Sequence, residues 1–283
     1  LMPAVDETID IGFENYHWQT VIGFMLGRFW RLLFRLRKRR FDLAVVFMPN
    51  IVRRILLAGL GCEFFIYGSR IDEYPGTLAF ELLRLAGVEE KGQQDVFDIP
   101  EPRNAGAILP SDLKRPYVCV HPFCGMAWRQ WNKFAALQER LAEIGGSIVV
   151  VGRKKDYAPT GPGHDLVNKL SIAELFWVIK QCDVLVTADS GPMHIGFAAG
   201  TPTVALFGPV KPELRVPPWR KEKHTILYKP SVESETVRRV TQREELDNTT
   251  MQKISVEEVT DAVKALLAKQ SEKCNRAKSE SDE

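Results

Sequence analysis

One uninterrupted strand, helix and strand pattern in the second half of the chain constrains its fold more than any other feature. The apolar run Val184–Ala188 is followed by a polar turn, a short helical stretch and a second apolar run, Thr203–Phe207. Asp189 and Ser190 are residue types that favour a helix N-cap, and Gly200 is typical of a helix C-terminus. We therefore predict a βαβ unit whose helix N-terminus can hold an anion.

The same alternation of strand and helix patterns extends over most of the chain. Ser171 and Glu174 have the spacing of a capping box, which predicts that a helix begins there. Alternating strands and helices indicate a parallel sheet covered by helices on both faces. The predicted strands are 41–47, 63–67, 117–121, 147–151, 184–188 and 203–207, and the predicted helices are 20–40, 51–60, 78–86, 132–144, 171–182, 192–199 and 255–267.

The stretch 91–114 is rich in Pro, Gly and polar residues and has no sustained hydrophobic period. It predicts a linker between two α/β domains. We expect an N-terminal domain over 1–108, a second Rossmann-like domain over 109–269 and a disordered Lys-, Ser- and Glu-rich tail over 270–283. In such sheets ligands bind at the carboxyl ends of the strands.

Composition excludes some classes of function. The net charge of +2 over 283 residues gives no global attraction to nucleic acid. The cysteines form no C-x-x-C pair and no metal-ligand cluster is visible, so we expect no metal, no cofactor and a reducing, cytoplasmic compartment. The five cysteines are Cys62, Cys119, Cys124, Cys182 and Cys274.

The turn and helix after Ala188 resemble the nucleotide-sugar site of the heptosyltransferase family, glycosyltransferase family 9. The family form is Asp-(Ser/Thr)-Gly-x-x-His, a small-residue helix, and a Gly-x-Pro strand that ends in Phe-Gly. Every fixed position of this form is present in the chain: Asp189, Ser190, Gly191, His194, Gly200, Pro202, Phe207 and Gly208.

A second block resembles the same family. His121–Pro122 ends a strand and Arg129–Gln130–Trp131 precedes a helix, where the family has His-Pro and Lys-x-Trp at this distance. Arg129 keeps the positive charge of the usual Lys and adds a planar fork suited to phosphate. Phe123–Cys124–Gly125 stand where the family commonly has small residues and a hydroxyl.

The resemblance implies a GT-B architecture, in which two Rossmann-like parallel-sheet domains face each other across a cleft. Pro3–Ile9 is similar to a family segment that follows the first strands, so the N-terminal domain is expected to be incomplete. The implied activity is an inverting, metal-independent transfer of heptose from ADP-heptose onto a lipopolysaccharide-core-like glycolipid or oligosaccharide acceptor. The family's general base lies in a loop without a counterpart in Leu1–Arg40, so we assign none.

Two alternatives of function stay open at this stage. The first is a nucleotide-sugar-binding remnant without transferase activity. The second is another GT-B sugar transferase or an epimerase, because fold alone does not fix function.

The resemblance also nominates donor-site residues. Arg129 is expected to contact the diphosphate and stabilise the leaving group, against the alternative of a surface arginine before a helix. Ser190 and Gly191 are expected to contact phosphate through a hydroxyl and an amide, or simply to begin the helix. Asp189 either binds a donor sugar hydroxyl or caps the helix, and His194 either donates to phosphate or packs under the loop.

The loop after the 147–151 strand offers Asp156 as a ribose ligand, since it is the one nearby carboxylate. The preceding Arg153–Lys155 either approach phosphate or acceptor, or form a solvated loop. His121, at a strand end, is expected to be a core histidine whose hydrogen bonds are satisfied.

The helical stretch 20–40 is amphipathic and strongly basic. One interpretation is a surface that meets anionic lipid at the inner face of the membrane, which would suit a lipid-anchored acceptor. The other is a domain helix with cations at its C-terminal end, where the helix dipole favours them. We favour the domain helix because a buried strand, 41–47, follows it. Charges interrupt its apolar positions too often for a transmembrane span.

Overall fold

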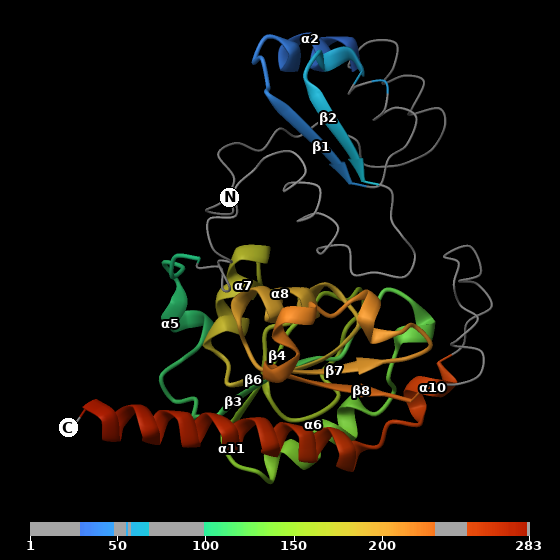
Figure 1. Ribbon diagram of the computed structural model, residues 1–283. Coiled ribbons are helices and arrows are strands. Elements are labelled where there is room, and N and C mark those ends of the chain that lie inside the picture. Colours follow the sequence, from blue (N-terminus) through green and yellow to red (C-terminus); the bar gives the residue numbers. More distant parts are fainter. Residues whose placement is uncertain (1–28, 48–54, 56–57, 68–98, 230–247, 282–283) are drawn as a thin grey trace. The chain divides into compact units, whose positions relative to one another are not determined.

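The computed structural model describes residues 29–47, 55, 58–67, 99–229 and 248–281 (Figure 1). The chain divides into two compact units, residues 1–93 and 94–283. The predicted helix over 78–86, most of the helix over 51–60, and the part of the basic helical stretch before Phe29 lie outside the described residues.

The first unit contains the helix α2 (Phe29–Arg37) and the strands β1 (Leu43–Phe47) and β2 (Glu63–Tyr67). The two strands are parallel, and Leu43 to Phe47 lie opposite Glu63 to Tyr67 in order. Both strands confirm the sequence prediction. One face of α2 is buried through Phe29 and Leu33, which are one helical turn apart.

The second unit is built on a six-stranded sheet in the order β5-β4-β3-β6-β7-β8, and every neighbouring pair is parallel. The chain order reverses between β3 and β6. Strands β3, β4, β6 and β7 confirm the predicted strands, whereas β5 and β8 were not predicted. The strands are β3 (Tyr117–His121), β4 (Ser147–Val150), β5 (His164–Asp165), β6 (Val184–Ala188), β7 (Thr203–Phe207) and β8 (His224–Tyr228).

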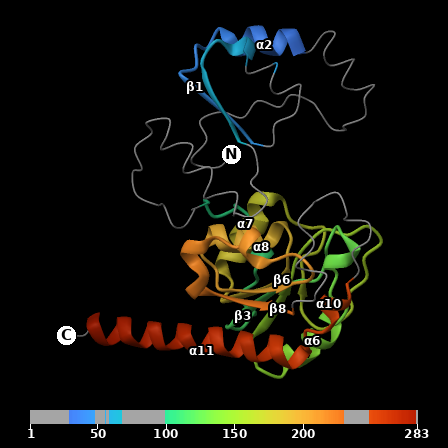
Figure 2. The same cartoon turned by 45° about the vertical axis from the view of Figure 1, so that its right-hand side comes forward.

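Helices cover both faces of this sheet (Figures 1 and 2). Helices α6 and α11 lie on one face, and α7 and α8 lie on the other. The helices are α5 (Ala105–Ile108), α6 (Phe134–Ala142), α7 (Ile172–Gln181), α8 (Gly191–Ala199), α10 (Thr249–Gln252) and α11 (Val256–Ser281), with short 3-10 turns η2 (Ala127–Arg129), η3 (Pro212–Leu214) and η4 (Pro218–Lys223).

The alternation of side chains along β3 explains the two-sided core. Val118 and Val120 pack in the cluster that contains α6 and α11, whereas Cys119 packs in the cluster that contains α7. All five residues of β6 are buried, as expected for a central parallel strand whose two faces are both covered. This explains why the sheet reads as continuous apolar runs.

The start of α7 confirms the predicted capping box. The Glu174 amide donates to Ser171 Oγ at 3.3 Å, and the Ser171 amide donates to Glu174 Oε2 at 2.8 Å. These contacts with Ser171, followed by the hydrogen bond from Asn104, hold the pKa of the Glu174 carboxyl below its usual value. Ser255 and Glu258 make the same pair of bonds at the start of α11, at 3.1 and 2.8 Å.

The boundary between the units differs from the predicted one after residue 108. Ala105 and Ile108 of α5 are buried in the same cluster as Phe176 of α7. The Asn104 side-chain amide also donates to Glu174 Oε1 at 3.0 Å. Residues 99–108 therefore belong with the second unit, because the apolar side chains of Ala105 and Ile108 complete its core.

The predicted disordered tail over 270–283 is corrected by the structure. Helix α11 continues past Leu267 and ends at Ser281. Gln270 Nε2 donates to the Asp183 carbonyl at 2.5 Å, and Ser271 Oγ donates to the Leu267 carbonyl at 3.2 Å. Lys, Glu, Ala and Arg are good helix formers, so a Lys- and Glu-rich composition does not by itself prevent a helix that already has a packed start.

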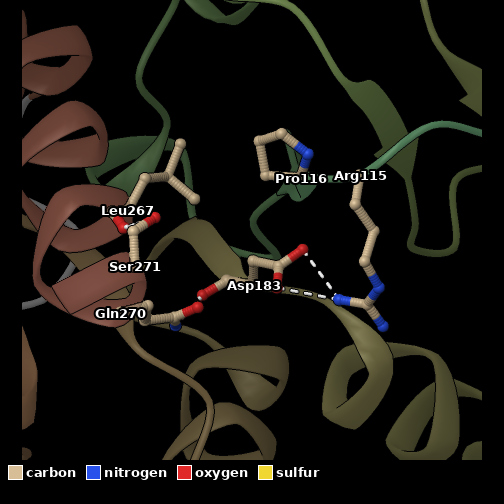
Figure 3. Close-up of a pocket in the computed structure, with 6 residues that line it drawn as sticks. All are labelled: Arg115, Pro116, Asp183, Leu267, Gln270 and Ser271. Atoms are coloured by element: carbon tan, nitrogen blue, oxygen red, sulfur yellow. Dashed lines mark hydrogen bonds and ion pairs between the residues drawn. The ribbon is translucent and has the colours of Figure 1, made fainter. Parts of the chain in front are cut away.

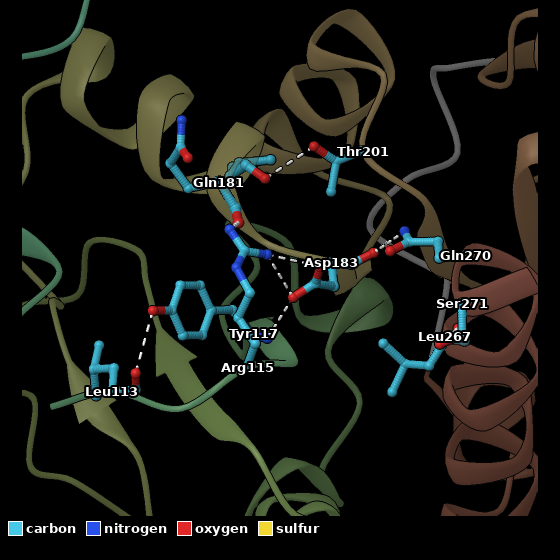
Figure 4. Close-up of polar contacts among 10 residues, drawn as sticks. Leu113, Arg115, Tyr117, Gln181, Asp183, Thr201, Leu267, Gln270 and Ser271 are labelled. Carbon is cyan, nitrogen blue, oxygen red and sulfur yellow. Dashed lines mark hydrogen bonds and ion pairs between the residues drawn. The ribbon is translucent and has the colours of Figure 1, made fainter. Parts of the chain in front are cut away.

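A network of polar contacts ties three segments together at the amino ends of β3 and β6 (Figure 4). The Asp183 carboxylate accepts from Arg115 Nη1 at 2.8 and 2.9 Å and from the Tyr117 amide at 2.6 Å. Arg115 also donates to the Gln181 carbonyl at 3.1 Å. An open pocket of about 350 Å³ lies beside this network (Figure 3), lined by Arg115, Pro116, Asp183, Leu267, Gln270 and Ser271.

Candidate functional site

The strand order identifies where a ligand should bind. In open parallel sheets, ligands lie outside the carboxyl ends of the strands where the strand order reverses. In this sheet the reversal lies between β3, which ends at His121, and β6, which ends at Ala188. The segment after β3 carries Arg129, and the segment after β6 begins with Asp189. The fold therefore brings the two motif blocks together.

Three contacts, two with Asp189 and one with Trp128, hold the Arg129 side chain in place. Its Nη1 donates to the Asp189 carbonyl at 3.1 Å, and its Nε lies 3.4 Å from Asp189 Oδ2. The ring of Trp128 lies under the guanidinium, 4.3 Å from Cζ to the ring centroid, which is a cation–π contact. The side chain is 17% exposed, so Arg129 is not the surface arginine of the alternative interpretation.

Asp189 is the centre of the cluster. Its side chain is 4% exposed, and Oδ2 lies 3.4 Å from Arg129 Nε and 3.9 Å from Arg215 Nε. A buried carboxylate is costly unless cations or hydrogen bonds pair with it, and here two guanidinium groups do so. Asp189 does not cap α8, because Ser190 occupies the N-cap position.

Arg215 was missed by the sequence analysis. It follows η3 in the segment after β7, the strand next to β6 in the sheet. Sequence periodicity carries no signal for such a residue, because its approach to Asp189 depends on the path of a loop. Its place after the carboxyl end of a strand beside the reversal point is the signal that could have found it.

The Ser190 hydroxyl points toward the strand ends. It donates to the Ala188 carbonyl at 3.0 Å and lies 3.1 Å from Thr187 Oγ1 and 3.3 Å from His121 Nδ1. It makes no capping bond to the α8 amides. The predicted phosphate contact through this hydroxyl is therefore less suited to the geometry than a contact through the backbone.

The start of α8 is open to a ligand at Gly191. No side chain caps this helix, and Pro192, in its first turn, has no amide hydrogen. A Cβ added to the exposed Gly191 would meet nothing within 4 Å, so a phosphate could approach its backbone amide. The other end of α8 confirms the prediction, because Gly200 is its C-cap in the left-handed conformation with φ of 74°.

His194 is exposed on α8 beside the arginine cluster. Its pKa is lowered by desolvation; the Asp189 carboxylate acts in the opposite direction, and Arg215 and then Arg129 lower it further. Its ring stands edge-on to Phe197, with 6.2 Å between the centroids. The exposed ring is in a position to meet a ligand, although the packing role is also compatible with this contact.

His121 is buried at the end of β3, as expected of a core histidine. Its Nδ1 lies 3.1 Å from Thr187 Oγ1, and burial lowers its pKa from 6.5 to about 4. Gly152, with φ of 136°, follows β4 and lies against this ring. A Cβ there would come within 2.6 Å of Phe123 Cδ2 and 2.8 Å of His121 Cδ2, so a larger residue would have to displace these rings.

Asp156 is the candidate that the fold does not join to the cluster. It lies exposed in the loop after β4, with φ of 54°, and within the described residues it forms no ion pair or hydrogen bond with Arg129 or Asp189. Of the neighbouring basic residues, Lys154 Nζ lies 5.5 Å from the centroid of the Phe123 ring. This loop therefore reaches the segment after β3 through Lys154.

Comparison with known proteins gives independent findings. The sequence model for glycosyltransferase family 9 (heptosyltransferase) matches residues 76–246. Lipopolysaccharide heptosyltransferase 2 of Escherichia coli K12 is 24% identical over 266 residues, which cover 76% of this chain and 72% of the relative. Lipooligosaccharide heptosyltransferase 2 of Haemophilus influenzae is 32% identical over 113 residues, covering 35% and 32% of the two chains.

Solved structures also resemble this chain. The family 9 glycosyl transferase of Veillonella parvula has a TM-score of 0.71 at 20% identity, over 86% of this chain and 79% of that one. The ADP-heptose lps heptosyltransferase II of E. coli has a TM-score of 0.67 at 18% identity, over 87% and 82%. At these identities the likeness concerns the fold.

Proposed function

Because this chain belongs to glycosyltransferase family 9 (heptosyltransferase) and has the α/β fold of GT-B glycosyltransferases, we propose that it transfers heptose from ADP-heptose to a lipopolysaccharide-core acceptor. The proposed reaction inverts the configuration at the anomeric carbon and needs no metal ion. Relatives named as lipopolysaccharide heptosyltransferase 2 and as an ADP-heptose heptosyltransferase support the choice of donor and acceptor. The structural observation that carries the proposal is the arginine-flanked Asp189 beside the open start of α8.

The chemistry of glycosyl transfer explains why this arrangement supports the proposal. As the bond between the anomeric carbon and the diphosphate breaks, negative charge develops on the leaving oxygen. Arg129 brings a guanidinium to the carboxyl edge of the sheet, and Gly191 brings an open backbone amide at a helix N-terminus. Both groups stabilise the negative charge that develops on the leaving diphosphate.

Each candidate residue then has a distinct proposed role. Arg129 and the Gly191 amide contact the diphosphate, and Asp189 orients Arg129 through the ion pair at 3.4 Å. His194, on the exposed first turns of α8, donates a hydrogen bond to the nucleotide sugar. Asp156 remains the proposed ribose ligand, in the loop after β4. The general base stays unassigned.

A lipid-linked acceptor would bring the enzyme to a membrane surface. On α2, Trp30 is 49% and Phe34 is 65% exposed, and the exposed Arg31 and Arg35 lie on the same helix. Exposed aromatic and basic side chains on one helix favour contact with an anionic lipid surface. Over the ranges that the structure covers, none of the helices combines the length and apolarity needed to cross a bilayer.

Calorimetric titration with ADP and with UDP tests the donor site. We expect the chain to bind ADP in preference to UDP. Gly191→Ala should weaken ADP binding about tenfold, because its methyl group adds bulk at the start of α8, where the diphosphate is proposed to lie, while disturbing no neighbour. Gly106→Ala is the matched control, since an added Cβ there also meets nothing within 4 Å but lies in α5.

The outcomes separate the three hypotheses of function. Preference for ADP, with transfer from ADP-heptose to a heptose-deficient lipopolysaccharide, supports the proposal. ADP binding without transfer indicates a nucleotide-sugar-binding remnant. Preference for UDP indicates another GT-B sugar transferase or an epimerase. If the wild type and Gly191→Ala bind ADP with equal affinity, the N-terminus of α8 is not part of the donor site.

A further inference from the structure

We propose that Arg215 is a second cation of the donor site, which binds the diphosphate of the nucleotide together with Arg129. The inference rests on the proposed function, because it assumes that a nucleoside diphosphate occupies this end of the sheet. It adds a residue outside both motif blocks and assigns it the recognition of a second phosphate group.

The shared carboxylate carries the argument. Asp189 Oδ2 lies between two guanidinium groups, 3.4 Å from Nε of Arg129 and 3.9 Å from Nε of Arg215. One carboxylate balances one guanidinium, so these three side chains leave an excess of one positive charge. Two like charges this close repel each other unless an anion joins them. A diphosphate supplies the negative charge that the cluster lacks.

The hydrogen-bond geometry points the same way. A separation of 3.9 Å is an ion pair but too long for a hydrogen bond, so Asp189 leaves the donors of Arg215 unused. Among the described residues, Arg215 Nε and Asp189 Oδ2 are both buried and neither has a hydrogen-bond partner. The guanidinium fork of Arg215, on a side chain that is 31% exposed, matches the oxygen atoms of a phosphate.

The backbone around Arg215 is fixed, so the position of its side chain is not that of a free loop. The amides of Arg215 and Val216 both donate to the Pro212 carbonyl at 2.8 Å. Val216 is 1% exposed and packs with Met193 of α8 and Phe207 of β7. The loop is thus anchored to the helix whose N-terminus forms the other side of the site.

The electrostatic field of Arg215 also reaches α8. Desolvation is the largest cause that lowers the pKa of His194, and the Asp189 carboxylate acts in the opposite direction. The charge of Arg215 lowers this pKa further, by more than the charge of Arg129 does. The positive charge of Arg215 therefore acts at the first turns of the helix, where the diphosphate is proposed to lie.

The test compares ADP with AMP by calorimetry, since the two ligands differ by one phosphate. Arg215→Met should weaken ADP binding about tenfold and AMP binding much less, because a charged hydrogen bond to the second phosphate is lost. Arg215→Lys should restore part of the ADP affinity. Lys211→Met, which removes an exposed cation just before η3, should bind both nucleotides like the wild type.

The ratio of ADP to AMP affinity separates ligand binding from a structural role. If Arg215 only supports the loop, both nucleotides lose affinity equally and Arg215→Lys gives no selective recovery, which overturns the inference. Unchanged ADP affinity in Arg215→Met also overturns it and leaves the proposed function intact. A wild-type chain that binds neither ADP nor pyrophosphate overturns both. Should Arg215→Met fail to fold, the ADP to AMP ratio of Arg215→Lys decides.

Discussion

A buried neutral histidine makes the stability of the second unit depend on pH. Burial lowers the pKa of His121 from 6.5 to about 4, so the unfolded chain takes up a proton at a pH where the folded chain does not. The contribution of neutral His121 to the free energy of unfolding should therefore be fully present above pH 6.5 and be lost as the pH decreases toward 4. Between pH 7.5 and pH 5 we expect a loss of about 2 kcal/mol from this residue, measured by urea unfolding.

His121→Gln supplies the comparison for this prediction. Glutamine does not titrate, so the variant should lose less stability than the wild type over the same pH interval, whatever its stability at pH 7.5. An identical loss in both proteins would show that His121 is protonated without cost in the folded state. The comparison of the two slopes removes the contribution of the other histidines.

At the residue scale, the sequence nominated Arg129 and Asp189 as separate candidates and did not predict their contact or their orientations. The two residues meet because the parallel order of β3 and β6 brings their loops together. The Ser190 hydroxyl instead points to the Ala188 carbonyl, and Arg215 arrives from a third loop. A motif fixes residue types and spacing, whereas rotamers and loop paths depend on contacts far apart in the sequence.

At the scale of secondary-structure elements, a polar network centred on Asp183 connects the amino ends of β3 and β6. Asp183 is 21% exposed and accepts three hydrogen bonds, two from Arg115 and one from the Tyr117 amide. Asp183→Ala should lower the free energy of unfolding by roughly 2–3 kcal/mol, because charged hydrogen bonds are lost and a partly buried amide loses its acceptor. Urea unfolding at pH 7.5 measures this loss.

Glu143→Ala is the control for this variant. Glu143 forms an ion pair with Arg140 at i,i+3 spacing, but its side chain is 62% exposed. Such surface pairs contribute little, so we expect a change below about 0.5 kcal/mol. Equal effects of the two substitutions would mean that the Asp183 network adds no more than an exposed salt bridge.

Helix α2 tests the two interpretations of the basic segment. If it meets lipid, Trp30→Ala with Phe34→Ala should reduce binding to phosphatidylglycerol vesicles about tenfold, because both exposed aromatic side chains would be buried in the bilayer surface. Co-sedimentation measures the bound fraction. Ile172→Ala, which removes an apolar side chain that is 80% exposed on α7, should leave it unchanged.

Vesicles of phosphatidylcholine complete this experiment. Anionic lipid should be required, because α2 ends in Arg35 and Arg37 and has no acidic residue in its first turn. Equal binding to both lipids, or no effect of the double substitution, favours the plain domain helix. That helix would already be accounted for by the buried Phe29 and Leu33.

Local patterns predicted the elements that are regular and apolar. The strands β3, β6 and β7 are five-residue apolar runs, and the capping box located the start of α7. The strand β8, His224–Tyr228, carries polar residues at its start, and β5 has only two residues, so neither gives a clear period. Beyond Leu267, α11 contacts Asp183 through Gln270, and no local pattern contains this contact.

At the scale of the whole molecule, the position of the boundary decides which piece of the chain can fold alone. The structure groups residues 94–283 in one unit, whereas the Pro- and Gly-rich composition of 91–114 suggested a linker over that stretch and a domain boundary after residue 108. Composition describes the flexibility of a free chain. It contains no information on tertiary packing, and here Ile108, which is 5% exposed, completes the core around α7.

Two shortened chains test this boundary. Residues 94–283 should unfold cooperatively, because the unit has its own sheet and core. Residues 109–283 should be less stable by roughly 2–4 kcal/mol, since loss of Ile108 uncovers the cluster that contains Phe176 and Trp177. The substitution Ile108→Ala within 94–283 should reproduce most of this loss in urea unfolding. If the two chains are equally stable, α5 is a tethered segment and the boundary belongs after residue 108.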